Sequence, residues 1–215
     1  MTELDLHELD RRSRIYERKE AAFGKSVALY SYCFENDNGI VPQLSEARNY
    51  VEHWEEMRQN NVGLLFWGLP GNGKTFAVAC IANALCEKLL DVRMTTIGCA
   101  LNALPSMTAQ DKLYYLNSLK TCDLLILDDF GMERRTDYAQ EQVFSLIDGR
   151  YLARQPLIIT TNLSLQDFKH PEDLNDQRIF DRILEICVPV CFDGPSLRQG
   201  KAKETMVRYR ELTGR

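Results

Sequence analysis

The stretch that decides the fold is Val62-Gly-Leu-Leu-Phe-Trp67, followed directly by Gly68-Leu-Pro-Gly-Asn-Gly-Lys-Thr75. The first part is a short apolar run, typical of a buried strand. The second part matches G-x-x-x-x-G-K-[ST] at every fixed position, and a helical segment, Thr75 to Leu90, follows it. Such a loop needs glycines because its backbone N–H groups must turn inward around a phosphate. The pattern therefore predicts a phosphate-binding loop between a strand and a helix.

The residues of this loop have distinct expected roles. Lys74 supplies a positive charge to the β- and γ-phosphates of a nucleotide, and we expect it to face solvent when the loop is empty. The hydroxyl of Thr75 is expected to bind Mg²⁺. The alternative, a chance glycine turn, is disfavoured by the strand and the helix on either side. The expected phosphate-binding residues are Gly68, Leu69, Pro70, Gly71, Asn72, Gly73, Lys74, Thr75 and Phe76.

A second apolar run, residues 124–127, ends in two acids, Asp128 and Asp129. A buried strand delivers such carboxylates at its C-terminal end, where open α/β sheets bind their ligands. We expect Asp128 to hold Mg²⁺, directly or through water, and Asp129 to polarise the attacking water. The alternative is a strand exit capped by solvated acids.

A third apolar run, Pro156-Leu-Ile-Ile, ends in Thr160-Thr-Asn162. If this strand lies between the other two, Thr161 or Asn162 can reach the γ-phosphate or the attacking water. Turn chemistry at the end of a strand explains the same residues equally well.

Three arginines are candidates for neutralising charge on a transferred phosphoryl group. Arg178 and Arg182 are four residues apart, hence on one helix face, and Arg198 follows Gly194-Pro-Ser. The alternative for the first two is a solvated face, paired with Asp176, Asp181 or Glu185.

Short apolar strands alternate with helices along most of the chain, which predicts an α/β fold with a parallel sheet covered on both faces. The expected strands are residues 62–67, 92–97, 124–127, 157–161 and 186–192. The expected helices are residues 46–59, 75–90, 137–153 and 176–186, with a weakly amphipathic helix in the first thirty residues.

Composition excludes several classes of protein. The 215 residues are 45% apolar and 27% charged, which excludes chain-wide disorder, and the apolar runs are too short for membrane spans. The acidic N-terminus does not resemble a secretory signal, so we expect a cytoplasmic protein with reduced thiols. Cys187 and Cys191 are better explained by packing than by a metal site. The net charge of −5 argues against indiscriminate coating of nucleic acid, although residues 198–215 are locally basic.

These motifs together resemble the DnaC/DnaI-type helicase loaders and the related IstB-type transposition ATPases, a branch of the AAA+ proteins. The resemblance runs from about Tyr32 to Arg198. It rests on G-L-P-G-N-G-K-T, L-L-I-L-D-D-F-G-M-E, I-I-T-T-N-L, R-I-F-D-R and F-D-G-P-S-L-R, in that order. The N-K-x-D loop of guanine-specific proteins is absent from the sequence, which favours adenine.

The resemblance implies a role for several residues. Asn162 is similar to the sensor-1 residue and Arg198 to the sensor-2 arginine. Arg182 corresponds to the arginine finger that acts on the ATP of a neighbouring subunit. The segment from Tyr32 to Asn36 resembles the part of the family that lies near the adenine.

The sequence departs from the wider AAA+ pattern at two places. Asp129 stands where many AAA+ proteins have glutamate, which slows hydrolysis in our interpretation. Few residues follow the last strand, so we expect a reduced C-terminal lid. We divide the chain into an N-terminal helical extension, residues 1–60, and an AAA+ ATPase domain with a short basic tail, residues 61–215.

The resemblance implies an ATP- and Mg²⁺-binding ATPase that assembles head to tail when ATP is bound. Its implied partners are a replicative helicase and single-stranded DNA, with no membrane. An IstB-like transposition helper and a nucleotide-gated binding module with little hydrolysis are the alternatives. A small-molecule kinase is disfavoured, because no acceptor site follows from the sequence.

A DNA contact is predicted between the second and third strands. The segment Lys112-Leu-Tyr-Tyr115, with Lys120 nearby, combines aromatic rings that stack on bases with lysines that meet phosphates. The alternative is that Tyr114 and Tyr115 pack in the core.

Overall fold

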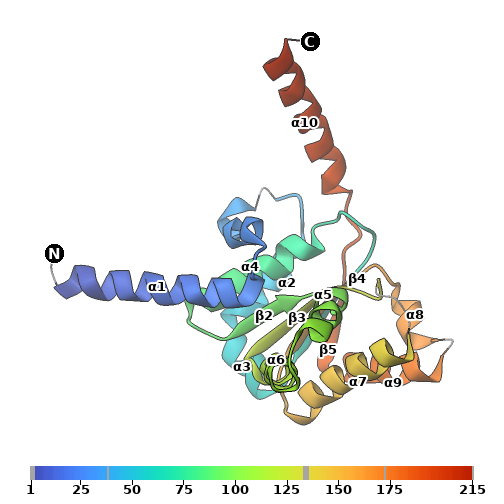
Figure 1. The fold of residues 1–215 in the computed structure, drawn as a ribbon. Coiled ribbons are helices and arrows are strands. Elements are labelled where there is room, and N and C mark those ends of the chain that lie inside the picture. The colour runs from blue at the N-terminus through green and yellow to red at the C-terminus, as the bar shows by residue number, and fades with distance from the viewer. Residues whose placement is uncertain (1–2, 38, 133–135, 172, 215) are drawn as a thin grey trace.

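A five-stranded parallel sheet forms the centre of the computed structural model (Figure 1), which describes residues 3–37, 39–132, 136–171 and 173–214 and, of these, the side chains of all but 3–6 and 198–204. The strand order is β2-β3-β4-β1-β5, so β4 lies between β1 and β3. The predicted α/β class with a parallel five-stranded sheet is confirmed. The strands are β1 (Gly63–Trp67), β2 (Val92–Thr95), β3 (Leu124–Phe130), β4 (Leu157–Thr161) and β5 (Cys187–Cys191).

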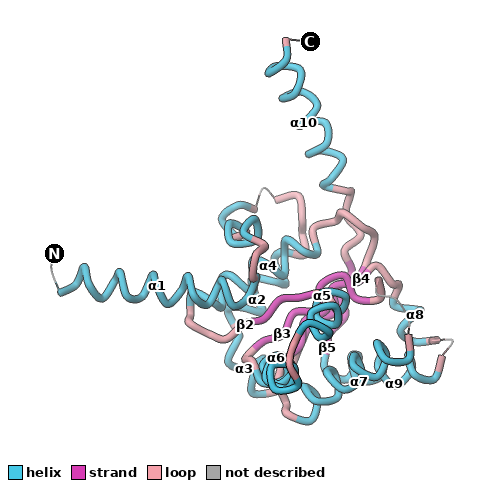
Figure 2. The backbone as a smooth tube through the Cα atoms, viewed as in Figure 1, coloured by secondary structure: helices cyan, strands magenta, loops and turns pink. Residues whose placement is uncertain are grey.

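Helices cover both faces of this sheet (Figure 2). Successive strand residues point to opposite faces; thus Leu64 and Phe66 join one hydrophobic cluster and Leu65 the other. The first cluster is covered by α1 (Glu3–Phe23), α2 (Leu44–Glu52), α3 (Trp54–Gln59) and α4 (Lys74–Glu87). The second is covered by α5 (Ile97–Ala103), α6 (Ala109–Thr121), α7 (Asp137–Leu152), α8 (Leu165–Lys169) and α9 (Leu174–Ile186).

The N-terminal residues contribute to the first of these clusters. Phe34, Tyr50 and Trp54 are buried there together with strand residues. Two short 3₁₀ helices, Val27–Ser31 and Phe34–Asn36, precede α2, and the first of them contacts α4. The helix expected over residues 46–59 is two helices, α2 and α3, interrupted at His53 (φ −103°, ψ 27°). The division of the chain at residue 60 remains a prediction.

Strand β3 is longer than the apolar run that predicts it. It continues through both acids to Phe130, and the register of its pairing with β4 shifts between Leu127 and Phe130. Asp129 has a φ of 52° at this irregularity. A bulge of this kind leaves residues without ladder partners and redirects their side chains.

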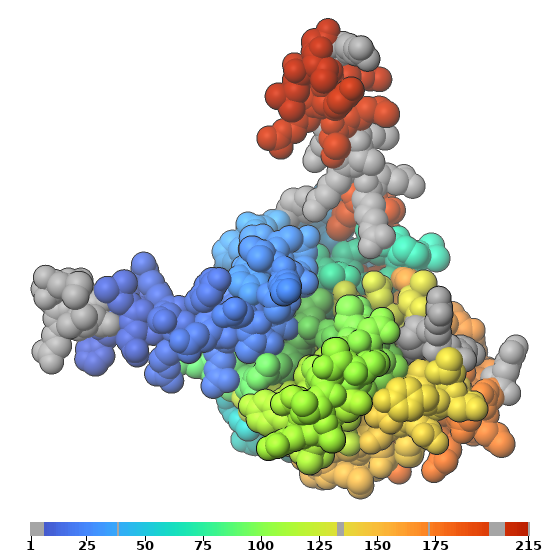
Figure 3. All heavy atoms as spheres, in the orientation of Figure 1, coloured from blue at the N-terminus to red at the C-terminus, as the bar shows by residue number. Residues whose placement is uncertain are grey.

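Two helices project from the body of the molecule. The N-terminal half of α1 and nearly all of α10 (Leu197–Thr213) stand clear of the sheet and its covering helices (Figures 1 and 3). Leu197, the first residue of α10, contacts the phosphate-binding loop: its N–H donates to Gly71 O over 2.9 Å. Among the described helices, none combines the length and the apolar content that crossing a bilayer requires.

Candidate functional site

The loop between β1 and α4 has the backbone that its glycines predict. Gly68, Gly71 and Gly73 have φ values of 139°, 88° and 94°, a region that other residues rarely adopt. A Cβ on Gly68 would lie 2.3 Å from Phe192 O, and one on Gly73 would lie 2.9 Å from a methyl carbon of Val41. The loop is therefore closely enclosed by segments from both ends of the chain, and only glycine fits at these two positions.

Lys74 lies inside this loop, with 5% of its surface exposed. Its Nζ donates to Gly68 O over 2.7 Å, to Leu69 O over 2.9 Å and to Asn162 Oδ1 over 3.0 Å. The expectation of a solvent-facing lysine is wrong, because the loop carbonyls and the end of β4 enclose the ammonium group. The same contacts bring Lys74 and Asn162 together, as the order of the strands predicts.

Asp128 lies opposite the first turn of α4. The hydroxyl of Thr75 donates to it over 3.2 and 3.1 Å, and the hydroxyl of Thr160 donates to its Oδ1 over 2.5 Å. Burial raises the pKa of Asp128 above its ordinary value, and the negative charge of Asp129 raises it further, whereas the two hydroxyl hydrogen bonds oppose the rise. Thr75 and Asp128 thus form an oxygen-rich pair of the kind that Mg²⁺ prefers.

Asp129 is exposed, in contrast to its neighbour. Its backbone N–H donates to Thr160 Oγ1 over 2.9 Å, and its left-handed backbone conformation turns the side chain out of the sheet. The carboxylate therefore faces the same space as Lys74.

One cavity of about 630 Å³ collects these groups. That volume is typical of a small-molecule or cofactor site. The glycine-lined floor, the ammonium group and the hydroxyl–carboxylate pair fit a nucleotide phosphate chain with its metal ion. The cavity is lined by Leu29, Tyr32, Pro70, Gly71, Gly73, Lys74, Thr75, Phe76, Asp128, Asp129, Met132, Asn162 and Leu197.

One wall of the cavity is aromatic and combines Tyr32 of the N-terminal segment with Phe76 of α4. The rings of Tyr32 and Phe76 lie 5.2 Å apart. Asn83, buried in α4, donates through Nδ2 to Leu29 O and Tyr32 O, each over 2.8 Å. One side-chain amide thus fixes this segment on the helix that follows the loop.

Of the two candidates at the end of β4, only Asn162 lines the cavity. Thr161 is fully buried, and its hydroxyl donates to Phe130 O over 2.8 Å. Its role in the structure is to hold the end of β3.

The arginines lie elsewhere. Arg182, on α9, donates to Asp148 of α7 and to Glu185, both over 3.2 Å, and lies 4.2 Å from the centre of the Tyr151 ring. It does not line the cavity of its own chain. Arg178 is exposed on the same helix, 4.8 Å from the Phe144 ring centre. The side chain of Arg198 lies outside the described residues, as does Glu133 of the D-D-F-G-M-E motif.

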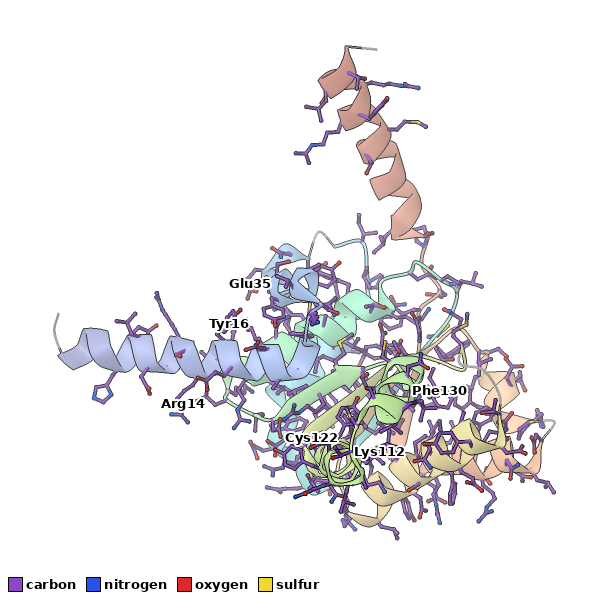
Figure 4. All side chains as sticks on the ribbon, in the orientation of Figure 1. Arg14, Tyr16, Glu35, Lys112, Cys122 and Phe130 are labelled. Atoms are coloured by element: carbon purple, nitrogen blue, oxygen red, sulfur yellow. The ribbon has the colours of Figure 1, made fainter. Side chains whose placement is uncertain are left out.

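The segment predicted to contact DNA lies on α6. Tyr114 is 79% exposed, whereas Tyr115 is half-buried and packs against the second hydrophobic cluster. Lys112, labelled in Figure 4, lies in the first turn, but Lys120 extends along the neighbouring helix and donates to Ser145 Oγ over 3.0 Å. The two tyrosines therefore differ, and only Tyr114 is open to solvent.

Sequence reasoning missed Arg150, which is fully buried. Its guanidinium donates to the carbonyls of Leu119 (3.2 Å) and Cys122 (2.7 Å) at the end of α6 and to that of Pro156 at the start of β4. Cys122 is labelled in Figure 4. No local sequence pattern predicts a buried arginine of this kind, because its hydrogen-bond partners lie outside its own helix.

The fold and the site together define a P-loop ATPase fold of the AAA+ class. A phosphate-binding loop leads from β1, inside the parallel sheet, into α4. The two acids lie on β3, which is separated from β1 by β4. The chain belongs to the family of IstB-like ATP binding proteins, whose model matches residues 3–205.

Curated relatives include two named replicative helicase loaders. The chain is 31% identical over 177 residues to DnaI of Bacillus subtilis, covering 76% of this chain and 56% of that protein. It is 29% identical over 150 residues to DnaC of Escherichia coli, covering 67% and 58%. The chain thus spans somewhat more than half the length of these relatives.

Solved structures show the same fold. A crystal structure of DnaI matches with a TM-score of 0.64 at 24% identity, covering 79% of this chain and 92% of that one. A crystal structure of the DnaC helicase loader matches with a TM-score of 0.59 at 26% identity, covering 68% and 86%.

Proposed function

We propose that this chain binds ATP with Mg²⁺ in the cavity and hydrolyses it slowly. The observation that carries the proposal is the meeting of Lys74, Thr75, Asp128, Asp129 and Asn162 at one cavity, although they come from three separate elements. Membership in a family of ATP binding proteins supports the same ligand.

Each residue has a chemical task in this proposal. Lys74 exchanges its carbonyl contacts for phosphate oxygens, and Asn162 orients the γ-phosphate or the attacking water. Thr75 and Asp128 would hold Mg²⁺, which supplies charge neutralisation on the phosphate oxygens when bound. Asp129 polarises the water. The adenine lies toward Tyr32, on the aromatic wall.

Turnover of ATP tests this part directly. We expect slow phosphate release by the full chain, stimulated by single-stranded DNA. Asp129→Asn should retain ATP affinity and lose turnover, because its carboxylate meets the water and not the nucleotide. Normal hydrolysis by this variant would contradict the assigned role, and tight ATP binding by the parent without turnover would favour the nucleotide-gated module.

The partner proposal is a replicative helicase in the cytoplasm, contacted together with single-stranded DNA and released by ATP hydrolysis. It is supported by the names of the relatives from Bacillus subtilis and Escherichia coli. The two projecting helices offer surfaces that the body of the chain leaves open.

Assembly is proposed to be head to tail. Arg182 lies away from the cavity of its own chain and would meet the nucleotide of a neighbour. Arg198, in the first turn of α10 and next to a residue that contacts the loop, is proposed as the sensor of the nucleotide within the chain.

An IstB-like transposition helper is the second candidate, favoured by the description of the matching family. Affinity purification of the tagged chain with ATP separates the two. A hexameric helicase among the retained proteins supports the loader, whereas a transposase and a preference for duplex DNA support the helper.

A further inference from the structure

The hydroxyl of Thr160 contacts both acids at the end of β3. Thr160 is fully buried in β4, and its Oγ1 lies 2.5 Å from Asp128 Oδ1 and 2.9 Å from the backbone nitrogen of Asp129. Asp128 belongs to the proposed Mg²⁺ pair, and Asp129 is the proposed water-polarising group. A single oxygen atom therefore joins two groups with different tasks.

The direction of these two hydrogen bonds is fixed. A backbone N–H only donates, so the Thr160 oxygen accepts from Asp129. The single hydroxyl proton is then directed at the carboxylate of Asp128, which as an ion only accepts. Thr75 donates to the same carboxylate from the opposite element, α4. Asp128 is thus held between two hydroxyl groups.

The bulge in β3 explains why a side chain is needed at this point. The register between β3 and β4 is regular up to Leu127 and resumes at Phe130, so residues 128 and 129 have no register partner on β4. Thr160 takes the place of the missing partner for the N–H of Asp129, whose φ is 52°. Thr161, the next residue, donates to Phe130 O on the far side of the bulge.

We propose that Thr160 is a positioning residue that couples the Mg²⁺-binding carboxylate to the water-polarising one. Its hydroxyl orients Asp128 toward Thr75 and holds the turn that presents Asp129 to the cavity, while Thr160 itself touches neither nucleotide nor metal. This inference rests on the proposed ATP and Mg²⁺ site and deepens it. The two acids are then coupled through one hydroxyl group, and removing it disturbs both.

The test compares variants of nearly equal shape in the full chain. Thr160→Val removes the hydroxyl and keeps the β-branched side chain, whereas Thr160→Ser keeps the hydroxyl. Thr161→Val is the matched control, because it removes a buried hydroxyl from the adjacent residue, whose partners are the backbone groups Phe130 O and Leu163 N–H and neither acid. Affinity for ATP is measured by calorimetry in EDTA and in MgCl₂, together with kcat and KM for hydrolysis.

We expect Thr160→Val to bind ATP in EDTA with the parent's affinity. The factor by which MgCl₂ increases that affinity should be about ten to a hundred times smaller than in the parent, as for a lost hydrogen bond to a charged group. Its kcat should fall more than its KM changes. Thr160→Ser should restore both quantities, and Thr161→Val should leave both near the parent values. Without nucleotide, amide hydrogen exchange at Asp129 should accelerate in Thr160→Val and stay slow in Thr160→Ser.

Several results would overturn this inference. If Thr160→Val has the parent's kcat and the parent's increase in ATP affinity with MgCl₂, this inference is wrong while the proposed ATP and Mg²⁺ site stands. The same holds if Thr161→Val loses as much of both quantities as Thr160→Val does. If Thr160→Val does not fold, Thr160→Ala is compared with Thr160→Ser, which differs by one oxygen atom, and equal behaviour of this pair overturns it. A parent that binds ATP no better with Mg²⁺ than without overturns the proposed metal site and this inference together.

Discussion

Lys74 and Arg150 are both buried cations, but they lie in different parts of the molecule and have different partners. Lys74 is 5% exposed at the edge of the cavity and Arg150 is fully buried between α6, α7 and β4. Lys74 donates to two carbonyls of a loop and to Asn162. Arg150 donates to carbonyls that end one helix and begin one strand.

The difference lies in what can replace these partners. Lys74 itself and one of its acceptors, Asn162, line a space of about 630 Å³, so phosphate oxygens placed there can replace its present partners. Most acceptors around Arg150 are main-chain carbonyls at the C-terminal end of α6, where a cation also meets the negative end of the helix dipole, and another is Pro156 O before β4. Burial lowers the pKa of Arg150, which is the cost of keeping a charge there. A buried charge thus indicates a ligand site only where the charged group itself lines a cavity; Lys74 lines this one and Arg150 does not.

Arg182 breaks this two-way comparison, because it is only half-buried and its partners are two acids. We expect monomeric Arg182→Ala to bind ATP with the parent's affinity. The hydrolysis rate that depends on assembly should fall by a factor of roughly 10³–10⁵. The measurement mixes Arg182→Ala, which retains a sound cavity, with Lys74→Ala, which retains a sound arginine. Each alone should be inactive, and the mixture should regain partial activity. No rescue despite demonstrated co-assembly would place Arg182 in a role within its own chain.

Arg150→Met should lower the free energy of unfolding by about 3–5 kcal/mol, because several buried carbonyls lose a charged donor at once. The protein that remains folded should bind ATP with the parent's affinity. Urea denaturation measures the first quantity and calorimetry the second. Arg178→Met, on the exposed face of α9, is the control and should change stability by less than about 0.5 kcal/mol. Equal effects of the two substitutions would remove the structural role assigned to Arg150.

Lys74→Ala should show the reverse pattern. We expect ATP affinity to fall about ten- to a hundredfold, since a charged hydrogen bond to phosphate is lost. The unfolding free energy should change little, because Asn162 lines the cavity and Leu69 is exposed, so water can reach acceptors that lose the donor. Calorimetric titration and denaturation of the same preparation test both statements. Unchanged affinity in a folded variant would refute the loop assignment.

Tyr114→Ala should lower affinity for single-stranded DNA by about fivefold, at the low end of what one stacked base contributes. Tyr115→Ala serves as the comparison, because Tyr115 packs against the second cluster and its loss should lower stability instead. Fluorescence anisotropy at two salt concentrations measures the DNA affinity. Equal DNA binding by Tyr114→Ala and the parent would remove α6 from the proposed DNA surface.

Asp128→Asn should give the smallest effect and the opposite sign, namely a more stable protein without ligand at pH 7. The folded-state pKa of Asp128 is raised, so the folded chain holds this proton to higher pH than the unfolded chain, and its stability falls as pH rises through that window. The amide that replaces the carboxyl group does not titrate and so avoids this loss. The difference in stability between Asp128→Asn and the parent should therefore vanish as the pH falls toward the ordinary carboxyl pKa of 3.8. Thermal unfolding across pH measures it. With MgCl₂ and ATP the order should reverse.

Sequence reasoning succeeded where chemistry demands a fixed spacing along the chain. The loop from Gly68 to Thr75 was readable because glycine and lysine are needed at set positions in it, and the apolar runs placed the five strands. The order of those strands then brings Asn162 beside Lys74.

It failed where a side chain finds its partner far along the chain. Arg150 meets carbonyls that lie 28 and 31 residues away, and nothing in the surrounding helix predicts them. The bulge at Asp129 depends on Thr160 from the neighbouring strand, so the apolar run alone ends β3 too early. The solvated-face alternative for Arg182 named Glu185, but its second partner, Asp148, belongs to another helix.

The two projecting helices also determine how the protein moves through a solvent. The accessible surface of the chain is 12918 Å², whereas a compact monomer of 24.8 kDa has about 10,200 Å². A body with such extensions diffuses more slowly than a sphere of equal mass, so a monomer elutes early from a sizing column and imitates a larger species. Light scattering, which reports mass independently of shape, is therefore the measurement that should count subunits when nucleotide is added.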